Sequence, residues 1–212
     1  MSQPLPASQS PVPQTATALA AFDFDGTIST RDTFFPFLLY AFGARAVYGA
    51  LVLGLLGLAR RQSTLDVRDR LKAALVRRLF AAAPRARLEA TAARYAGEVL
   101  ATAMRPGALE RIRWHRAQGH RCVMVSASLD IYLQHIAPAL GFDDLLCTRL
   151  GAVGDVYTGE LVDGNCRRGR KVERLTALLG DLAQYHVYAY GDSAGDTEML
   201  AIAHERHYRP FV

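Results

Sequence analysis

The chain has 212 residues, of which 50% are hydrophobic and 21% are charged, and its formal net charge at pH 7 is +5. A chain of this size and composition can bury a substantial core, as one domain or one domain with an insertion. Its three cysteines show neither close pairing nor zinc spacing, which argues against a disulfide framework and favours reduced thiols in a cytoplasmic protein.

Residues 1–16 are predicted to form a disordered N-terminal tail. They are rich in Pro, Ser and Gln and carry no charged side chain. The segment lacks the basic start and the apolar core of a signal peptide. We therefore expect a cytoplasmic protein rather than a secreted one.

A short apolar run at residues 17–22 predicts a buried parallel strand that ends at Asp23. Open α/β sheets place their ligands at the carboxyl ends of such strands. Asp25 follows, and a turn at Gly26 can direct both carboxylates towards one site. One carboxylate could attack phosphorus while the other handles protons. Taken alone, the same sequence is also a common turn.

Residues 32–104 are predicted to form a helical cap, because leucine, alanine and arginine recur there with helical spacing. Residues 60–116 hold fourteen Lys or Arg against five Asp or Glu, so this side is strongly basic and the remainder is net acidic. The charge has three interpretations: solvated helix faces, an electropositive lid over a phosphorylated substrate, and nucleic-acid binding. Basic residues interleaved with aromatics on a strand are absent from the sequence, so nucleic acid is not expected as a partner.

The first part of this cap is unusually apolar. Arg45 is the only charged residue between positions 33 and 59, and residues 46–59 have none. This uncharged run is shorter than the roughly twenty residues that a membrane-spanning helix needs. We favour a pair of buried cap helices. The alternative is a hydrophobic, basic-rimmed cap that meets a membrane surface or a lipid phosphate.

The second motif begins at Ser126, which follows an apolar run at residues 121–125 that predicts another strand. Its hydroxyl and the amides of a helix from about Leu129 would form an anion site. Lys171 would supply further positive charge. The simpler interpretations are a helix-capping serine and one charge on a solvated face.

The last motif places Asp192 after the apolar run at residues 186–190, again at a strand end. Its carboxylate is the obvious further ligand for Mg²⁺, because hard oxygen ligands beside a phosphate favour that ion. Asp196 can brace the loop or Lys171. Each cluster alone fits a turn, but the conjunction of four clusters in this order favours a phosphoryl-transfer site.

Together the four motifs resemble the signature of the haloacid dehalogenase superfamily of phosphohydrolases. The closer likeness is to its phosphoserine-phosphatase-like subfamily with a helical cap, subfamily IB. The resemblance runs from about residue 18 to residue 211. It implies an α/β fold with a Rossmann-like three-layer core and a parallel sheet, formed by residues 17–31 and 105–212, plus the inserted small helical cap domain.

The resemblance also implies a role for each motif residue. Asp23 would be the nucleophile that forms an aspartyl-phosphate, and Asp25 the general acid and then the base. Asp23, the main-chain carbonyl of Asp25 and Asp192 would hold Mg²⁺, while Asp196 would support the metal loop. The residues implied to bind phosphate are Ser126, Ala127, Lys171, Gly26 and Thr27.

The sequence departs from phosphoserine phosphatases at several positions. Gly26 stands where that family usually has serine, Ala127 and Ser128 stand where it has glycines, and Asp32 stands where it has glutamate. These departures argue against phosphoserine as the substrate. Candidate substrate contacts in the cap are Asp32, Phe34, Arg68 and Arg70.

The leading prediction is a Mg²⁺-dependent phosphatase that hydrolyses phosphate monoesters, with a small organic phosphate as its substrate. A second is a lipid-phosphate phosphatase, because phosphatidylglycerophosphate phosphatases of the same superfamily also carry a very apolar cap. A third is a non-catalytic phosphate- or membrane-binding module, against which the intact catalytic set argues. Transfer to an acceptor other than water stays open. We expect a cytoplasmic location, with peripheral contact at the inner face of a membrane under the second prediction.

Overall fold

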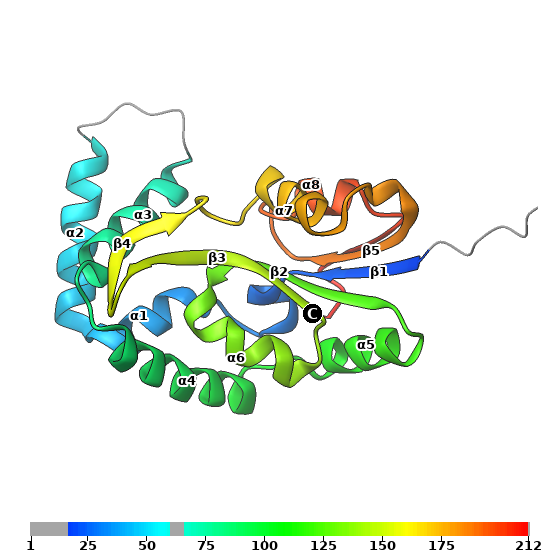
Figure 1. Ribbon diagram of the computed structural model, residues 1–212, viewed down its shortest axis with the longest axis horizontal. Helices are drawn as coiled ribbons and strands as arrows, with labels where there is room; N and C mark the ends of the chain where they lie inside the picture. The colour runs from blue at the N-terminus through cyan, green and yellow to red at the C-terminus, as the bar shows by residue number, and fades with distance from the viewer. Residues whose placement is uncertain (1–16, 60–65, 212) are drawn as a thin grey trace, which may run out of the picture.

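A six-stranded sheet forms the centre of the protein in the computed structural model, which describes residues 17–59 and 66–211 (Figure 1). The strand order is β4-β3-β2-β1-β5-β6, and neighbours are parallel except β3 and β4. The strands are β1 (Thr17–Phe22), β2 (Arg121–Leu129), β3 (Asp144–Val153), β4 (Val156–Val162), β5 (Tyr185–Gly191) and β6 (Glu205–Tyr208). The predicted α/β fold is confirmed, with an antiparallel pair that the sequence did not predict. The predicted tail at residues 1–16 lies outside the described residues.

Alternate side chains of β1 enter two cores, one on each face of the sheet. Ala20 and Phe22 pack with α5 (Pro106–Ala117) and α6 (Asp130–Leu140). Leu19 and Ala21 pack with α7 (Gly169–Leu179) and α8 (Thr197–Ala201). Burial on both faces explains why the strand is an unbroken apolar run rather than an alternating one. Figure 1 shows the two helical layers on opposite sides of the sheet, which is the predicted three-layer core.

Between the end of β1 and the start of α5, the described residues form four helices, as the sequence of this region predicts. They are α1 (Phe34–Phe42), α2 (Ala44–Ala59), α3 (Val67–Phe80) and α4 (Arg85–Thr102). A single wide turn, η1 (Phe24–Ile28), joins β1 to the insertion, and a short helix, η2 (Leu182–Gln184), precedes β5. Within the described part of the chain, no helix has the length and apolar character needed to cross a membrane. The limits 32–104 of the cap as a domain stay a prediction.

Helix α2 is apolar on nearly all sides, but only one stripe of it is buried. Val47 is fully buried and Ala50 is 6% exposed. Five large apolar side chains of the same helix are 49% to 56% exposed, namely Tyr48, Val52, Leu53, Leu55 and Leu56. The prediction of two buried cap helices is therefore wrong for α2. Its main packing partners are α3 and α1, and its other side faces solvent.

The link between α3 and α4 is hydrogen-bonded to the antiparallel pair β3–β4. The amide of Ala82 donates to the carbonyl of Tyr157 at 2.9 Å, and the amide of Tyr157 donates to the carbonyl of Ala83 at 3.0 Å. The amide of Arg85 donates to the carbonyl of Asp155 at 2.9 Å. The inserted helices are thus attached to the core by backbone pairing as well as by their two chain connections.

Candidate active site

The first motif turns sharply where β1 ends. The amide of Asp23 donates to the carbonyl of Tyr190 at 2.9 Å, which holds the end of β1 against β5. Gly26 then has a φ of +80°, a conformation that residues with a Cβ rarely adopt. A Cβ at this position would also lie 2.4 Å from Oδ2 of Asp192. Glycine therefore allows the first and last motifs to approach each other.

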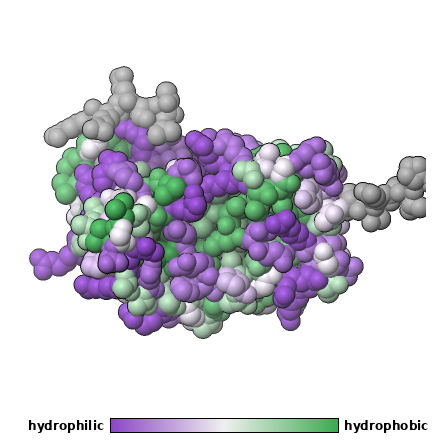
Figure 2. All heavy atoms as spheres, viewed as in Figure 1, coloured by the Kyte–Doolittle hydropathy of each residue, from purple (hydrophilic) through white to green (hydrophobic). Residues whose placement is uncertain are grey.

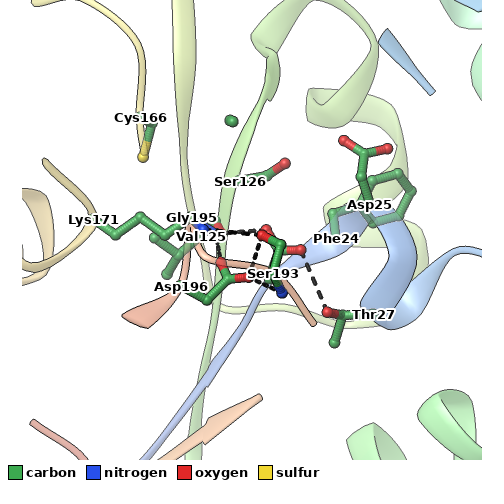
Figure 3. Close-up of polar contacts among 12 residues, drawn as sticks. Phe24, Asp25, Thr27, Val125, Ser126, Cys166, Lys171, Ser193, Gly195 and Asp196 are labelled. Carbon is green, nitrogen blue, oxygen red and sulfur yellow. Dashed lines mark hydrogen bonds and ion pairs between the residues drawn. The ribbon is translucent and has the colours of Figure 1, made fainter. Parts of the chain in front are cut away.

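Lys171 joins two of the predicted carboxylates in a buried cluster (Figure 3). Its Nζ lies 2.5 Å from Oδ1 of Asp23 and 2.6 Å from Oδ1 of Asp196, and it donates to the carbonyl of Val125 at 2.7 Å. All three charged side chains are nearly inaccessible to solvent. Charges buried to this degree need partners, because an unpaired ammonium or carboxylate would lose its hydration without compensation. The structure thus brings the first, third and fourth motifs together.

Burial and neighbouring charges oppose each other in this cluster. Burial raises the pKa of Asp23, and the ammonium of Lys171 opposes that rise. Burial alone would lower the pKa of Lys171, but the carboxylates of Asp23 and Asp196 hold it above its usual value. Burial likewise acts against ionisation of Asp196, yet Lys171 and the donors of Ser193 keep the pKa of Asp196 below its usual value. Lys171 is therefore a fixed positive charge beside Asp23.

Asp25 lies on the other side of the cluster from Lys171 (Figure 3) and is held by hydroxyl groups. Its Oδ1 accepts from the amide of Thr33 at 2.8 Å and from the hydroxyl of Thr33 at 2.5 Å. Its Oδ2 accepts from the hydroxyl of Ser128. Burial raises the pKa of Asp25 to about 6, and the nearby Asp32 adds to the rise. A carboxyl group with such a pKa is suited to giving and taking a proton near neutral pH.

Thr33, which sequence reasoning did not identify, lies where the cap meets the core. Its hydroxyl is 3.2 Å from the hydroxyl of Tyr132 on α6, and its carbonyl accepts from the hydroxyl of Tyr95 on α4 at 2.7 Å. Two tyrosines from different layers therefore fix the group that orients Asp25. The sequence offers no signal for this arrangement, because isolated Thr and Tyr residues in helical segments are common core residues.

Three carboxylates could hold a metal ion. Asp23, Asp192 and Asp196 each offer an oxygen atom, and these oxygens lie within 4.8 Å of one another. Both oxygens of Asp196 are already engaged, since Oδ1 accepts from Lys171 and Oδ2 accepts from the amide and hydroxyl of Ser193. Burial first, and then the charge of Asp196, raises the pKa of Asp192. An all-oxygen donor set of this kind fits Mg²⁺.

The remaining predicted phosphate-binding residues have different surroundings. The hydroxyl of Thr27 donates to Oδ2 of Asp23 at 3.4 Å and to Oδ1 of Asp192 at 3.5 Å, so it bridges the two carboxylates. Ser126 is fully buried, and its Oγ accepts from the amide of Ser128 at 3.0 Å. Ala127 lines the cavity at the site. Their roles in binding phosphate stay predictions.

A cavity of about 500 Å³ lies between cap and core and contains the candidate catalytic groups. Of the four predicted substrate contacts in the cap, Asp32, Phe34 and Arg68 line it. Arg70 is not among the lining residues, and its guanidinium donates to the carbonyl of Leu58 at 3.1 Å.

Lys72 of α3 also lines this cavity, and sequence reasoning missed it. Its ammonium donates to the carbonyl of Ala127 and, at 3.1 Å, to Oδ1 of Asn165, and it lies 4.6 Å from the centre of the Phe34 ring. Burial lowers the pKa of Lys72 to about 8. A signal was present in the composition, because only two of the 25 basic residues are lysines, Lys72 and Lys171. Both lysines are buried at this site.

Two further contacts join the same side of α3 to the loop that follows β4. Asp66, just before α3, pairs with Arg167 at 2.9 Å. Asp69 accepts from Nδ2 of Asn165 at 2.6 Å. These two residues and Lys72 follow one another at three-residue spacing, which places them along one side of the helix. The cap is therefore held against the core next to the cavity.

Proteins of similar sequence include Protein CicA of Caulobacter vibrioides (strain NA1000 / CB15N). It is 40% identical over 196 residues, which cover 91% of this chain and 86% of that protein. Phosphoserine phosphatase ThrH of Pseudomonas aeruginosa is 33% identical over 109 residues, which cover 50% of each chain.

Solved structures of similar fold include a protein of unknown function from Bordetella pertussis Tohama I. It superposes with a TM-score of 0.75 at 24% identity and covers 88% of this chain and 87% of that one. A phospho-aspartyl intermediate analogue of phosphoserine phosphatase superposes with a TM-score of 0.56 at 22% identity, covering 89% of this chain and 84% of that one. These likenesses show a shared fold, including a helical insertion between the first two strands of the sheet.

The sequence profile described as haloacid dehalogenase-like hydrolase matches residues 20–201. The matched stretch contains all four motifs, and the geometry above brings their charged side chains to one edge of the sheet. The chain belongs to the haloacid dehalogenase-like hydrolase family.

Proposed function

We propose that the protein is a Mg²⁺-dependent phosphatase that hydrolyses phosphate monoesters through an aspartyl-phosphate at Asp23. The observation that carries the proposal is a pair of carboxyl groups with different surroundings in one cavity. Asp23 is paired with Lys171 at 2.5 Å, whereas Asp25 is held by hydroxyls and has a pKa raised to about 6 by burial. A nucleophile and a separate proton donor are the groups that covalent phosphoryl transfer requires.

In the first step, a carboxylate oxygen of Asp23 attacks phosphorus and the bond from phosphorus to the ester oxygen breaks. Asp25, in its carboxylic acid form, gives its proton to that oxygen, so the product leaves as an alcohol. Lys171 and the second motif, with Ser126 and Ala127, are proposed to bind the phosphoryl oxygens and stabilise their charge.

In the second step, the carboxylate of Asp25 takes a proton from water while the water oxygen attacks phosphorus. The bond between phosphorus and Asp23 breaks, which releases inorganic phosphate and restores both carboxyl groups. An alcohol in place of water would be phosphorylated by the same sequence of events, so the intermediate allows a second type of acceptor.

Asp23, Asp192 and the main-chain carbonyl of Asp25 are the groups proposed to hold Mg²⁺, with Asp196 keeping the loop in place. The side chain of Asp25 is engaged by Thr33 and Ser128, which leaves its carbonyl for this role. When bound, the ion neutralises the negative charge that would otherwise separate the carboxylates from the phosphate.

The substrate is proposed to be a small organic phosphate or the phosphorylated end of a larger molecule. The cavity is about 500 Å³ in volume, and its cap side presents the positive charges of Arg68 and Lys72 beside the ring of Phe34. Cations in a partly enclosed cavity favour an anionic substrate. Asp32 is the one carboxylate on that side, and it makes a second anionic group next to it unfavourable.

The test is phosphate release from an aryl phosphate with and without Mg²⁺, comparing the wild type with Asp23→Asn. We expect turnover that requires Mg²⁺ and falls at least about a thousandfold in the variant, because the amide cannot serve as the nucleophile. Asp155→Asn makes the same chemical change at an exposed position of the β3–β4 turn and should leave turnover unaltered.

A cap that excludes the aryl substrate would give no turnover in any variant. In that case, binding of beryllium fluoride, which mimics a phosphoryl group on aspartate, is measured by calorimetry in the presence of Mg²⁺. Binding to the wild type and not to Asp23→Asn supports the proposal. Equal binding to both proteins, or none to either, would overturn it.

A further inference from the structure

The outer face of α2, formed by Tyr48, Val52, Leu53, Leu55 and Leu56, is the largest group of exposed apolar side chains on one helix in the described residues. These residues are 49% to 56% exposed, and no other element of the described residues carries more than two large exposed apolar side chains. A helix that is apolar all round is normally covered on all sides. Exposed apolar groups of this kind mark a surface that contacts a partner or a membrane. In Figure 2, apolar residues of the cap are visible at the left end of the molecule.

Positive charge borders this outer face. Arg45 is the one charged residue of α2, and it is exposed. Arg78 of α3 is also exposed, and its guanidinium donates to the carbonyl of Leu53 at 3.3 Å. Neither arginine takes part in any of the ion pairs found between described residues. The helix itself contains no acidic residue, so the surface combines apolar area with unneutralised cations.

The outer face of α2 also adjoins the lining of the cavity. The ring of Tyr48 lies 6.2 Å from the ring of Phe35, measured between centroids, and Phe35 lines the cavity. On the buried side of the same helix, Gly54 lies against Leu71, a second lining residue, so α2 as a whole packs on the cap wall of the cavity. Whatever covers α2 is therefore brought next to the cap side of the cavity.

We propose that the outer face of α2 docks the protein on the surface of an anionic lipid bilayer. Large aliphatic and tyrosine side chains bordered by arginine match a bilayer surface, where acyl chains lie beneath anionic headgroups. The docking is peripheral, because no described helix is long and apolar enough to cross a membrane. Phosphate monoesters at the headgroup level then lie beside the cavity.

Charge favours a bilayer over a second copy of the chain. A second copy that met this one through α2 would bring only further apolar side chains and arginines to the contact. Like charges placed together oppose association, and α2 offers no carboxylate to neutralise them. An anionic lipid surface neutralises both arginines instead.

The first experiment is flotation of the full chain with vesicles of phosphatidylcholine alone or mixed with phosphatidylglycerol. We expect binding to the anionic vesicles, at least about tenfold weaker binding to the neutral ones, and weakening by salt. Leu53→Glu combined with Leu56→Glu should abolish binding. A matched control is Val153→Glu with Leu178→Glu, which adds the same charge at exposed apolar positions on β3 and α7. This control should bind the anionic vesicles within about twofold of the wild type.

The vesicle experiment does not depend on catalysis, so Asp23→Asn should float as the wild type does. Turnover of a soluble aryl phosphate without vesicles should be equal in the wild type and the Leu53→Glu, Leu56→Glu protein, which also shows that this variant is folded. Absence of binding to anionic vesicles, or equal binding by the α2 variant, would overturn the proposal. A dimer in solution that the α2 variant converts to a monomer would also overturn it, because α2 would then cover a second copy.

Discussion

The ammonium of Lys72 donates to the main-chain carbonyl of Ala127, so a side chain of the cap reaches the backbone of the second motif. The same carbonyl accepts from the hydroxyl of Thr148 at 2.7 Å. The next residue, Ser128, donates its hydroxyl to Asp25. The position of the cap and the position of the proposed proton donor are therefore linked through two consecutive residues.

Replacing Lys72 with methionine should lower kcat/KM for an aryl phosphate by about tenfold to a hundredfold. The change removes a cation that lines the cavity and its contacts with Ala127 and Asn165, while methionine keeps the length of the apolar stem. Thermal stability should change little, because loss of a buried charge removes its desolvation cost as well as its contacts.

Arg77→Met is the control for Lys72→Met, because Arg77 lies on the same helix in an exposed pair with Glu160. Such surface pairs contribute about 0–1 kcal/mol to folding, and neither residue of this pair lines the cavity. Unchanged kinetics in Lys72→Met would show that the lysine neither binds substrate nor positions the cap.

Thr33→Val should lower kcat for the same substrate by about tenfold with little change in KM. The valine has the same shape but cannot donate to Oδ1 of Asp25, and a hydrogen bond to a charged group contributes about 1.5–3 kcal/mol. Thr91→Val on the exposed side of α4 is the matched control. A rise in KM at constant kcat would contradict a positioning role for Thr33.

Gly26→Ala should raise the Mg²⁺ concentration needed for half-maximal activity by at least about tenfold. The new Cβ would lie 2.4 Å from Oδ2 of Asp192, so a proposed metal ligand must move. A positive φ also costs an alanine about 1–2 kcal/mol. Gly119→Ala separates the two effects, because Gly119 has a φ of +71° and a Cβ there would meet no other atom within 4 Å. If both variants required the same Mg²⁺ concentration, the contact with Asp192 would not control metal binding.

His115 should make the protein less stable as the pH falls from about 6.5 towards 3. The residue is fully buried, with its ring nitrogens 2.7 Å from Nδ1 of His120 and 2.8 Å from the hydroxyl of Tyr190. Burial first, and then the charges of His120 and Arg111, lower the pKa of His115 to about 3. In that pH window the unfolded chain binds a proton that the folded protein does not, so the stability present above pH 6.5 is progressively lost.

Urea unfolding at pH 7, 6 and 5 measures this loss for the wild type and for His115→Gln. A single histidine contributes a slope of at most about 1.4 kcal/mol per pH unit. The variant should be less stable at pH 7 and show a flatter dependence on pH. If the free energy of unfolding changed with pH equally in the wild type and in His115→Gln, the acid sensitivity would come from other groups.

Much of the fold and the charged cluster could be predicted because apolar runs precede the motifs. The apolar run at residues 17–22 predicts a strand, and β1 is Thr17–Phe22. Parallel strands end at the same edge of a sheet, so side chains that follow β1 and β5 must lie close together. Local sequence and sheet topology together are enough to bring Asp23 near Asp192.

The contacts of the cap could not be predicted in the same detail. Tertiary packing decides which side of a helix meets the core. Arg70 and Lys72 are two residues apart on α3, and a helix turns them to different sides. Lys72 enters the cavity, while Arg70 donates to Leu58. The exposure of α2 has a similar cause, since composition predicts burial and only the arrangement of its neighbours reveals an uncovered side.

The backbone pairing of the α3–α4 link with Tyr157 and Asp155 determines what must move when substrate enters. A cap joined to the core by its two chain connections alone could swing open as a separate lid. Here such a swing would break three backbone hydrogen bonds unless the β3–β4 hairpin moved with the helices. The pairing between these strands shifts register between Leu150 and Ala152. Opening of the cap would therefore require the tip of the hairpin to move with the four helices, and we expect the bend at this register shift, in the antiparallel pair at one edge of the sheet.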